Sequence, residues 1–251
     1  MPAYATVVIP ARLASVRFRE KMLASKTGKP LVQHVYEAAS RAKYVSRVVV
    51  ATDHDRIADA VRAFGGGVVM TRSEHPNGTS RLAEACSALG IDTRGIVVNV
   101  QGDEPEMDPT LIDDLVETLD REGPHGAPIA TVATPFRESE DPADPMCVKV
   151  VVSTQGKALY FSRACIPFDR DGHGVARLKH LGIYAYRRSF LDDYVRLKPG
   201  IAEVAESLEQ LRALENGYSI KVIVRDGEFF GGIDTEAQYN AFVDRHSKRQ
   251  K

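Results

Sequence analysis

A strand that ends in an acidic turn is the first place in this sequence where chemistry is expected. The largely apolar run 96–100 is followed by Gly102, Asp103 and Glu104, which predicts a buried strand with acids at its carboxyl end. In open α/β sheets, ligands bind in the crevice outside the carboxyl ends of the strands. Asp103 is therefore the first candidate for a metal ligand, although a turn closed by Pro105 would also explain these residues.

A second carboxylate lies near the end of the chain. Asp234 follows two glycines and an isoleucine and precedes Thr235, so it is a candidate N-cap for a final helix. It is also a candidate metal ligand, because Mg²⁺ typically takes one or two carboxylates and completes its octahedron with waters and substrate phosphates. Asp103 and Asp234 together predict a magnesium site that bridges a nucleotide.

A cationic segment follows the first predicted strand. It carries Arg12, Ser15, Arg17, Arg19 and Lys21. Arginine side chains can bind phosphate oxygens in a bidentate manner, and a lysine acts as a mobile point charge. This composition indicates a polyphosphate site, with a solvated charged loop as the alternative. Neither the P-loop pattern nor GxGxxG occurs in the sequence, so those two nucleotide-binding fingerprints do not apply.

Further polar clusters are suited to small ligands. Residues 77–81 predict a helix start, whose free N–H groups can meet an anion or a base edge, with Arg81 within reach. The segments 160–163, 179–184 and 206–212 each place polar groups beside apolar anchors, an arrangement that can hold a hydroxylated acid. The alternative for each is a structural role. His180 would then be a satisfied core histidine, and Glu209 and Gln210 would be part of a helix face.

The elements that position these residues alternate between strand and helix over the first half of the chain. Period-two and buried apolar runs predict strands at 4–9, 47–52, 68–70 and 96–100, and helical spacing predicts helices at 31–39, 57–64, 81–89 and 109–119. We expect Asp53 or Asp55 to cap the second helix. The alternation predicts an α/β fold with a doubly wound, mostly parallel sheet and right-handed crossovers.

The pattern changes after about residue 125. Strands are predicted at 129–133, 148–152, 158–161 and 179–187 without helices between them. We therefore expect a single domain over residues 1–251 with an antiparallel insertion at about 127–187. A helix at 207–214, a strand at 219–224 and a closing helix after Asp234 complete the prediction.

Composition limits the possible classes of protein. The 251 residues include 33 Lys and Arg against 34 Asp and Glu, a formal charge of −1. The chain thus lacks the net positive charge that is typical of a protein that binds nucleic acid. The three cysteines are widely spaced, which argues against a disulfide framework or a structural zinc site. The amino-terminal residues carry neither a signal-peptide nor a membrane-span pattern. We expect a cytoplasmic protein that binds neither nucleic acid nor membrane.

The ordered motifs closely resemble those of the 3-deoxy-manno-octulosonate cytidylyltransferase (CMP-Kdo synthetase) family. They are residues 10–17 with Lys21, 28–31, 33–37, 51–53, 100–105, 160–163, 179–184, 206–212 and 232–235. The resemblance covers nearly the whole chain. It implies a nucleotide-diphospho-sugar transferase-like fold in which the antiparallel insertion contributes to a homodimer interface and closes over the sugar.

The resemblance also implies an activity and a set of site residues. The activity is Mg²⁺-dependent transfer of CMP from CTP to the anomeric 2-hydroxyl of Kdo, with release of pyrophosphate, for lipopolysaccharide synthesis. The implied cytidine contacts are the Pro10 backbone, Arg12, Gly78, Thr79, Arg81 and Gln101; Arg17 and Lys21 would bind the triphosphate, and Asp103 and Asp234 the metal. The implied sugar contacts are Arg163, His180, Tyr184, Glu209 and Gln210, with their cations facing the sugar carboxylate. The predicted catalytic group is Arg17, Lys21, Asp103 and Asp234.

The chain departs from the family pattern at a few positions. Arg19 and Met22 stand where the family typically has proline, and Cys165 and Phe168 where threonine and tryptophan are more common. Arg19 is either an added phosphate contact or a solvated side chain, and we expect Cys165 to be packing rather than a reactive thiol.

Other functions remain open from the sequence. One is a cytidylyltransferase for a related acid such as 8-amino-Kdo or, less favoured, a sialic acid. Another is a non-catalytic module that binds a nucleotide sugar. A glycosyltransferase that uses Asp103 in a metal motif would release a nucleoside phosphate instead of pyrophosphate.

Overall fold

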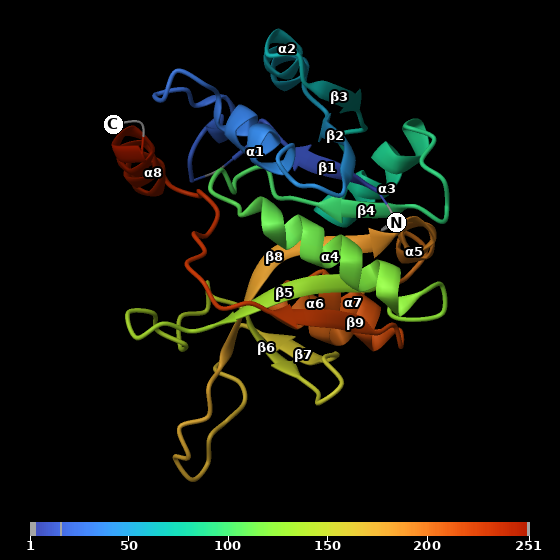
Figure 1. Ribbon diagram of the computed structural model, residues 1–251, viewed down its shortest axis with the longest axis vertical. Coiled ribbons are helices and arrows are strands. Elements are labelled where there is room, and N and C mark those ends of the chain that lie inside the picture. The colour runs from blue at the N-terminus through green and yellow to red at the C-terminus, as the bar shows by residue number, and fades with distance from the viewer. Residues whose placement is uncertain (1–3, 16, 250–251) are drawn as a thin grey trace.

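The computed structural model describes residues 4–15 and 17–249 and is built on a nine-stranded sheet (Figure 1). The strands are β1 (Ala5–Ala11), β2 (Val45–Thr52), β3 (Gly67–Met70), β4 (Ile96–Asn99), β5 (Ile129–Pro135), β6 (Lys149–Val152), β7 (Ala158–Ser162), β8 (Leu178–Arg187) and β9 (Ile220–Val224). Their main path runs in the order β3-β2-β1-β4-β8-β5-β9. The pairs β3–β2, β2–β1, β1–β4 and β5–β9 are parallel, whereas β8 is antiparallel to both of its neighbours β4 and β5. The predicted α/β class with a largely parallel sheet is confirmed.

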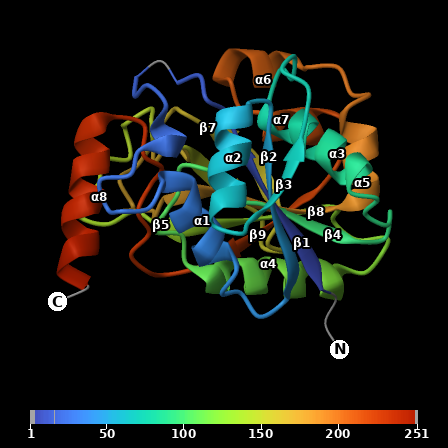
Figure 2. The same ribbon diagram turned by 90° about the horizontal axis from the view of Figure 1, so that it is seen from above.

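Helices cover both faces of this sheet (Figure 2). They are α1 (Leu31–Ala39), α2 (Asp55–Ala63), α3 (Gly78–Ala88), α4 (Pro109–Glu122), α5 (Arg188–Tyr194), α6 (Ile201–Glu206), α7 (Gln210–Glu215) and α8 (Glu236–Arg249), with a 3₁₀ turn η1 at Lys21–Leu23. The apolar sides of α1, α2 and α4 share one core with Val7 and Val98, and those of α3, α5 and α7 share a second core with Val8 and Val97. Successive strand residues point to opposite faces, so these buried strands are apolar on both sides and the sheet is doubly wound.

Two long strands that the sequence assigned to an insertion lie within the central sheet. β5 and β8 are inside the range 127–187, yet both belong to the main path, and only the β6–β7 hairpin lies off it. Figure 1 shows this hairpin below the sheet, beside an extended loop that leads into β8. The insertion is therefore smaller than the range that the sequence suggested.

Several local predictions were wrong. The helix expected over 207–214 is interrupted at Ser207, whose φ of 51° ends α6, and α7 begins only at Gln210. Helix α2 is capped by His54, which accepts from the N–H of Arg56, and not by Asp53 or Asp55. Helices α5 and α6 were not predicted. Within the described residues, no helix has both the length and the apolar character needed to cross a membrane.

Candidate functional site

The site lies where the winding of the sheet changes direction. β1 pairs with β2 on one side and with β4 on the other, so the crevice outside the carboxyl ends of β1 and β4 is a topological switch point. The acidic turn after β4 packs against the end of β1: a Cβ added to Gly102 would lie 2.8 Å from the Pro10 carbonyl oxygen and 3.2 Å from Met22 Sδ. Glycine at this position allows the close approach that holds Asp103 over the crevice.

Four side chains from three distant segments meet there. The Lys21 ammonium donates to Asp103 Oδ2 at 2.6 Å, to Asp234 Oδ1 at 3.0 Å and to the Ile233 carbonyl at 3.0 Å. Arg17 donates to the other oxygen of Asp234 at 2.8 Å. The structure thus brings together Arg17, Lys21, Asp103 and Asp234, the four residues that the sequence grouped as catalytic.

The electrostatics of this cluster favour the charged form of Lys21. Lys21 is only 8% exposed, and burial lowers its pKa, but Asp103 and Asp234 outweigh that effect and hold the pKa of Lys21 above its usual value. A protonated Lys21 neutralises part of the charge on two carboxylates that converge on one point. The same point is suited to a metal or to the oxygens of a phosphate chain.

The carboxylate of Asp234 is free to join this cluster because Thr235 and Gln238 cap the last helix. Thr235 Oγ1 accepts from the N–H of Gln238, and Gln238 Oε1 accepts from the N–H groups of Asp234 and Thr235, which is the reciprocal pattern of a capping box. The Asp234 carboxylate therefore faces Lys21 and Arg17. Gly232, two residues before Asp234, also approaches Asp103 closely, since an added Cβ would lie 3.1 Å from Asp103 Oδ1.

The two carboxylates suit a hard divalent cation. Mg²⁺ usually takes one or two carboxylates and keeps waters and substrate phosphates as its other ligands. No third His, Cys, Asp or Glu joins them to form a metal cluster within the described chain. The donor set that the structure provides is thus two hard oxygen ligands beside two cations, which fits a metal held jointly by protein and polyphosphate.

The altered loop is partly anchored. Met22 is buried beneath Gly102, and the Phe18 ring packs on Tyr239 at 5.3 Å between centroids. Glu20 has a φ of 55° and pairs with Arg56 at the start of α2. Arg19 itself is exposed, and its contribution to phosphate binding stays a prediction.

The two arginines expected to contact cytidine differ in their surroundings. Arg12 is exposed and donates to the His75 carbonyl at 2.8 Å. Arg81 is fully buried and donates to Thr71 Oγ1 at 2.6 Å and Asp53 Oδ2 at 2.7 Å. In the structure Arg81 therefore braces the start of α3 against the end of β2, and a direct contact with a base remains a prediction.

The start of α3 is joined to the segment before α7. Glu209 accepts from the N–H groups of Gly78 and Thr79, both at 3.3 Å, and from Thr79 Oγ1 at 2.8 Å. A carboxylate is favoured at this end of a helix by the free N–H groups and the macrodipole. Two residues expected to contact cytidine are thus bonded to one expected to contact the sugar.

A cavity of about 240 Å³ collects most of the remaining predicted residues. Its wall includes Thr79, Gln101, His180, Tyr184, Glu209 and Gln210, together with Asn99, Val148, Gly182, Tyr186, Ser207 and Leu208. Burial lowers the pKa of His180 to about 3, and its ring nitrogen Nε2 lies 3.0 Å from Thr131 Oγ1. Burial also raises the pKa of Tyr184. Both shifts favour the neutral form of the ring in this structure, and the role of His180 toward the sugar carboxylate stays a prediction.

Arg163 is held outside that wall. Its Nε donates to the Glu206 carbonyl at 2.8 Å and its Nη1 to the Pro145 carbonyl at 3.0 Å, while its own carbonyl accepts from the fully buried Lys149 at 2.5 Å. It is not among the described residues that line the cavity. A role for Arg163 toward the sugar carboxylate therefore stays a prediction.

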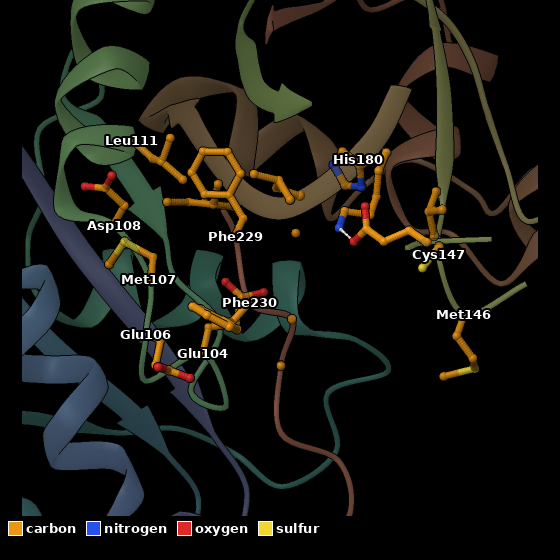
Figure 3. A pocket seen from close by; sticks show the side chains of 18 residues that line it. Glu104, Glu106, Met107, Asp108, Leu111, Met146, Cys147, His180, Phe229 and Phe230 are labelled. Atoms are coloured by element: carbon orange, nitrogen blue, oxygen red, sulfur yellow. Dashed lines mark hydrogen bonds and ion pairs between the residues drawn. The ribbon is translucent and has the colours of Figure 1, made fainter. Parts of the chain in front are cut away.

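A larger cavity of about 540 Å³ was not anticipated (Figure 3). It shares Val148, His180 and Gly182 with the smaller one, and its wall also includes Gly232, Phe229 and Phe230. In Figure 3 the carboxylate of Glu104 points into it. Burial, with a smaller contribution from Asp103, raises the pKa of Glu104 to about 8. The two neighbouring phenylalanines before Gly231 are the sequence signal that could have indicated it.

Comparison with known proteins agrees with this geometry. A family model described as cytidylyltransferase matches residues 6–222. The 3-deoxy-manno-octulosonate cytidylyltransferase of Geobacter sulfurreducens is 49% identical over 92% of this chain and 94% of that protein. The 8-amino-3,8-dideoxy-manno-octulosonate cytidylyltransferase of Shewanella sediminis is 48% identical over 87% of this chain and 89% of that protein.

A solved structure is also similar throughout. The structure of CMP:2-keto-3-deoxy-manno-octonic acid synthetase complexed with CTP superposes with a TM-score of 0.91 at 41% identity, over 98% of this chain and 100% of that one. Sequence, fold and site geometry lead to one conclusion: the chain belongs to the 3-deoxy-manno-octulosonate cytidylyltransferase (CMP-Kdo synthetase) family.

Proposed function

We propose that this protein is a nucleotidyltransferase that activates Kdo with CTP, giving CMP-Kdo and pyrophosphate. The observation that carries the proposal is the convergence of Asp103, Asp234, Lys21 and Arg17 at the switch point of the sheet. In a chain with family relatives of that activity, this cluster offers two carboxylates for a metal and two cations for a triphosphate.

The reaction needs positioning and charge neutralisation more than a nucleophilic side chain. The anomeric oxygen of the sugar forms a bond to the α-phosphorus of CTP as the bond from that phosphorus to the pyrophosphate oxygen breaks. Arg17 and Lys21 would neutralise charge that grows on the leaving pyrophosphate. Bound Mg²⁺, held by Asp103 and Asp234, would supply Lewis-acid charge at the phosphate oxygens.

The 240 Å³ cavity is proposed to hold the acceptor sugar. Its wall combines neutral hydroxyl and amide groups with the carboxylate of Glu209, whose oxygens are bonded to the start of α3. Such a wall suits a polyhydroxylated ligand. The cavity wall also includes Asn99 of β4, several residues of β8, and Gln101 of the turn that carries Asp103.

The identity of the acceptor needs a direct comparison. Relatives named for Kdo and for 8-amino-3,8-dideoxy-manno-octulosonate are 49% and 48% identical to the chain, so overall similarity does not separate the two sugars. We favour Kdo and retain the 8-amino sugar as the alternative for the same mechanism.

A homodimer is proposed on the side of the β6–β7 hairpin. Large apolar side chains are exposed there on β7 and α6, with Leu159 at 61%, Ile201 at 90% and Val204 at 69%. A monomer rarely leaves such a group of apolar residues uncovered. Light scattering on the purified protein would test this, and a monomeric mass would contradict it. A cytoplasmic place in lipopolysaccharide synthesis is part of the same proposal and follows from the sequence resemblance.

The proposal is tested by pyrophosphate release from CTP and Mg²⁺, run in parallel with Kdo, 8-amino-Kdo, a sialic acid and no acceptor. Release with Kdo is expected. Preference for the amino sugar would keep the mechanism and change the acceptor. Binding of CTP without release for any acceptor would point to a non-catalytic module, and release of CDP or CMP in place of pyrophosphate would point to a glycosyltransferase.

A further inference from the structure

Helix α8 is tied to the acidic turn through one buried carboxylate. The side chain of Glu106, which follows Asp103 in that turn, is only 5% exposed. Arg245 of α8 donates to its Oε1 from Nε at 3.2 Å and to its Oε2 from Nη2 at 2.5 Å, and Arg249 Nη1 lies 3.3 Å from Oε1. A paired contact between an arginine fork and a carboxylate adds geometric specificity as well as energy.

The same guanidinium reaches the segment that carries the second carboxylate of the site. Arg245 lies 4.4 Å from the centroid of the Phe230 ring, and Phe230 precedes Asp234 in the segment after β9. Helix α8 begins at Glu236, directly beyond Asp234. Arg245 therefore contacts the segment before Asp234 from the helix after it, and holds both to the turn that carries Asp103.

Two further links between these segments lie beside the carboxylates themselves. The Ile233 N–H donates to the Asp103 carbonyl at 2.8 Å, and Lys21 donates to both Asp103 and Asp234. Attachment at one end of a turn does not fix its direction, whereas a second attachment at the other end does. The ion pair of Glu106 provides that second attachment.

The space around the turn makes this ion pair important. Glu106 and Met107 line the 540 Å³ cavity (Figure 3) and also a cavity of about 270 Å³ between the turn, α1 and α8. Groups that border open space lack close-packed partners on that side. Helix α8 itself is anchored, because Tyr239 and Phe242 are buried in one cluster with Leu31 of α1. The position of the turn relative to α8 thus depends on the polar pair more than on apolar packing.

We propose that Glu106 and Arg245 are positioning residues for the metal site. Their ion pair fixes the turn that carries Asp103 against the helix that follows Asp234, and so sets the spacing of the two carboxylates. Mg²⁺ demands near-ideal octahedral geometry, so a displaced carboxylate binds it more weakly. This rests on the magnesium site of the proposed function and adds two residues that act through Asp103 and Asp234.

The test measures Mn²⁺ binding to the full chain without CTP, from the electron paramagnetic resonance signal of the free ion; Mn²⁺ favours the same oxygen ligands as Mg²⁺. The variants are Glu106→Gln, Arg245→Met and the double variant. We expect each single variant to weaken binding by about tenfold. The double variant should lose no more than either single one, because both residues act through one contact.

The sign of the Arg245→Met effect separates positioning from simple electrostatics. Loss of a positive charge near the site would by itself strengthen the binding of a cation, whereas loss of the ion pair weakens it. The Mg²⁺ concentration for half-maximal pyrophosphate release should rise in parallel in all three variants. KM for Kdo at saturating Mg²⁺ should stay unchanged.

Two controls account for lost charge and lost stability. Arg121→Met removes an exposed arginine of α4 that pairs with Glu117 at 2.7 Å, and Ile57→Val removes a methylene from the buried face of α2. Both should bind Mn²⁺ as the wild type does. Unchanged affinity in the single variants at the ion pair, tighter binding by Arg245→Met, or additive losses in the double variant would overturn the proposal. The expected affinities in a protein that releases no pyrophosphate with any acceptor would support the positioning role and refute the proposed function.

Discussion

The ammonium nitrogen of Lys21 lies 2.6 Å from Oδ2 of Asp103, although the two residues are 82 positions apart in the chain. The same nitrogen lies 3.0 Å from Oδ1 of Asp234. One cation thus occupies the point on which two carboxylates converge. If these carboxylates held Mg²⁺ as proposed, the charge of Lys21 would be available to the triphosphate.

Replacing Lys21 by methionine should separate metal binding from catalysis. Without the ammonium group, the two carboxylates repel each other more strongly, so Mg²⁺ affinity in the absence of CTP should rise. Turnover should fall by about 100-fold or more, because a charge that stabilises the transition state is lost. Calorimetric Mg²⁺ titration and kcat for pyrophosphate release check the two effects. A weaker metal affinity in Lys21→Met would contradict the arrangement.

Asp103→Asn and Asp234→Asn should each reduce activity by orders of magnitude and leave the fold intact, since each removes a charged metal ligand but preserves shape. Pyrophosphate release as a function of Mg²⁺ concentration and the circular dichroism spectrum are the measurements. Asp244→Asn, on the exposed side of α8, is the matched control. Mg²⁺-dependent turnover retained in either site variant would refute the metal assignment.

Two adjacent glycines provide a test of geometry near Asp103. A Cβ at Gly232 would lie 3.1 Å from Asp103 Oδ1, whereas a Cβ at Gly231 would meet no atom within 4 Å. Gly232→Ala should shift the carboxylate by a few tenths of an ångström and lower kcat by about tenfold. Gly231→Ala should keep wild-type kinetics. Equal activity in the two variants would show that the position of Asp103 is not critical.

The buried His34 should make the protein less stable in mild acid. Burial, and then the nearby His246, lower the pKa of His34 to about 4; Glu37 opposes this shift and Lys29 adds to it. The unfolded state, with a histidine pKa near 6.5, binds more protons between about pH 7 and pH 4. Stability is therefore full above about pH 6.5 and falls as the pH drops toward 4.

The matched variant is His34→Gln, which keeps a partner for Thr27 Oγ1, at 2.7 Å from His34 Nε2. Between pH 7 and pH 5, the wild type should lose about 2 kcal/mol more of its unfolding free energy than the variant. Urea unfolding at the two pH values measures this difference. An identical loss in both proteins would mean that His34 is not kept neutral.

The part of the fold that depends on local pattern could be predicted from the sequence. Strands such as β1 and β4 are apolar on both faces because helices cover both sides of the sheet, and each helix between them has a strong apolar period. The reversed direction of β8 gives no local signal, so β5 and β8 were assigned to an insertion. Helix α6 was missed because Ile201 and Val204 are exposed and give it no core-facing pattern.

The site could be predicted only as far as single residues indicate chemistry. Carboxylates after a strand and at the start of a final helix pointed to Asp103 and Asp234, and the structure brings both to Lys21. The shape of the 240 Å³ cavity could not be found this way, because its wall comes from segments far apart in the sequence, such as Gln101, Tyr184 and Gln210. The cavity exists only once β8 and α7 are in place.

The most direct test of the account is the fate of the α-phosphorus of CTP. With CTP labelled at that atom, Mg²⁺ and Kdo, the label should appear in a CMP-sugar in an amount equal to the pyrophosphate released, and Asp103→Asn should abolish both. Label that remains in CTP, or that appears in free CMP or CDP without a CMP-sugar, would contradict the assignment of the protein as a cytidylyltransferase.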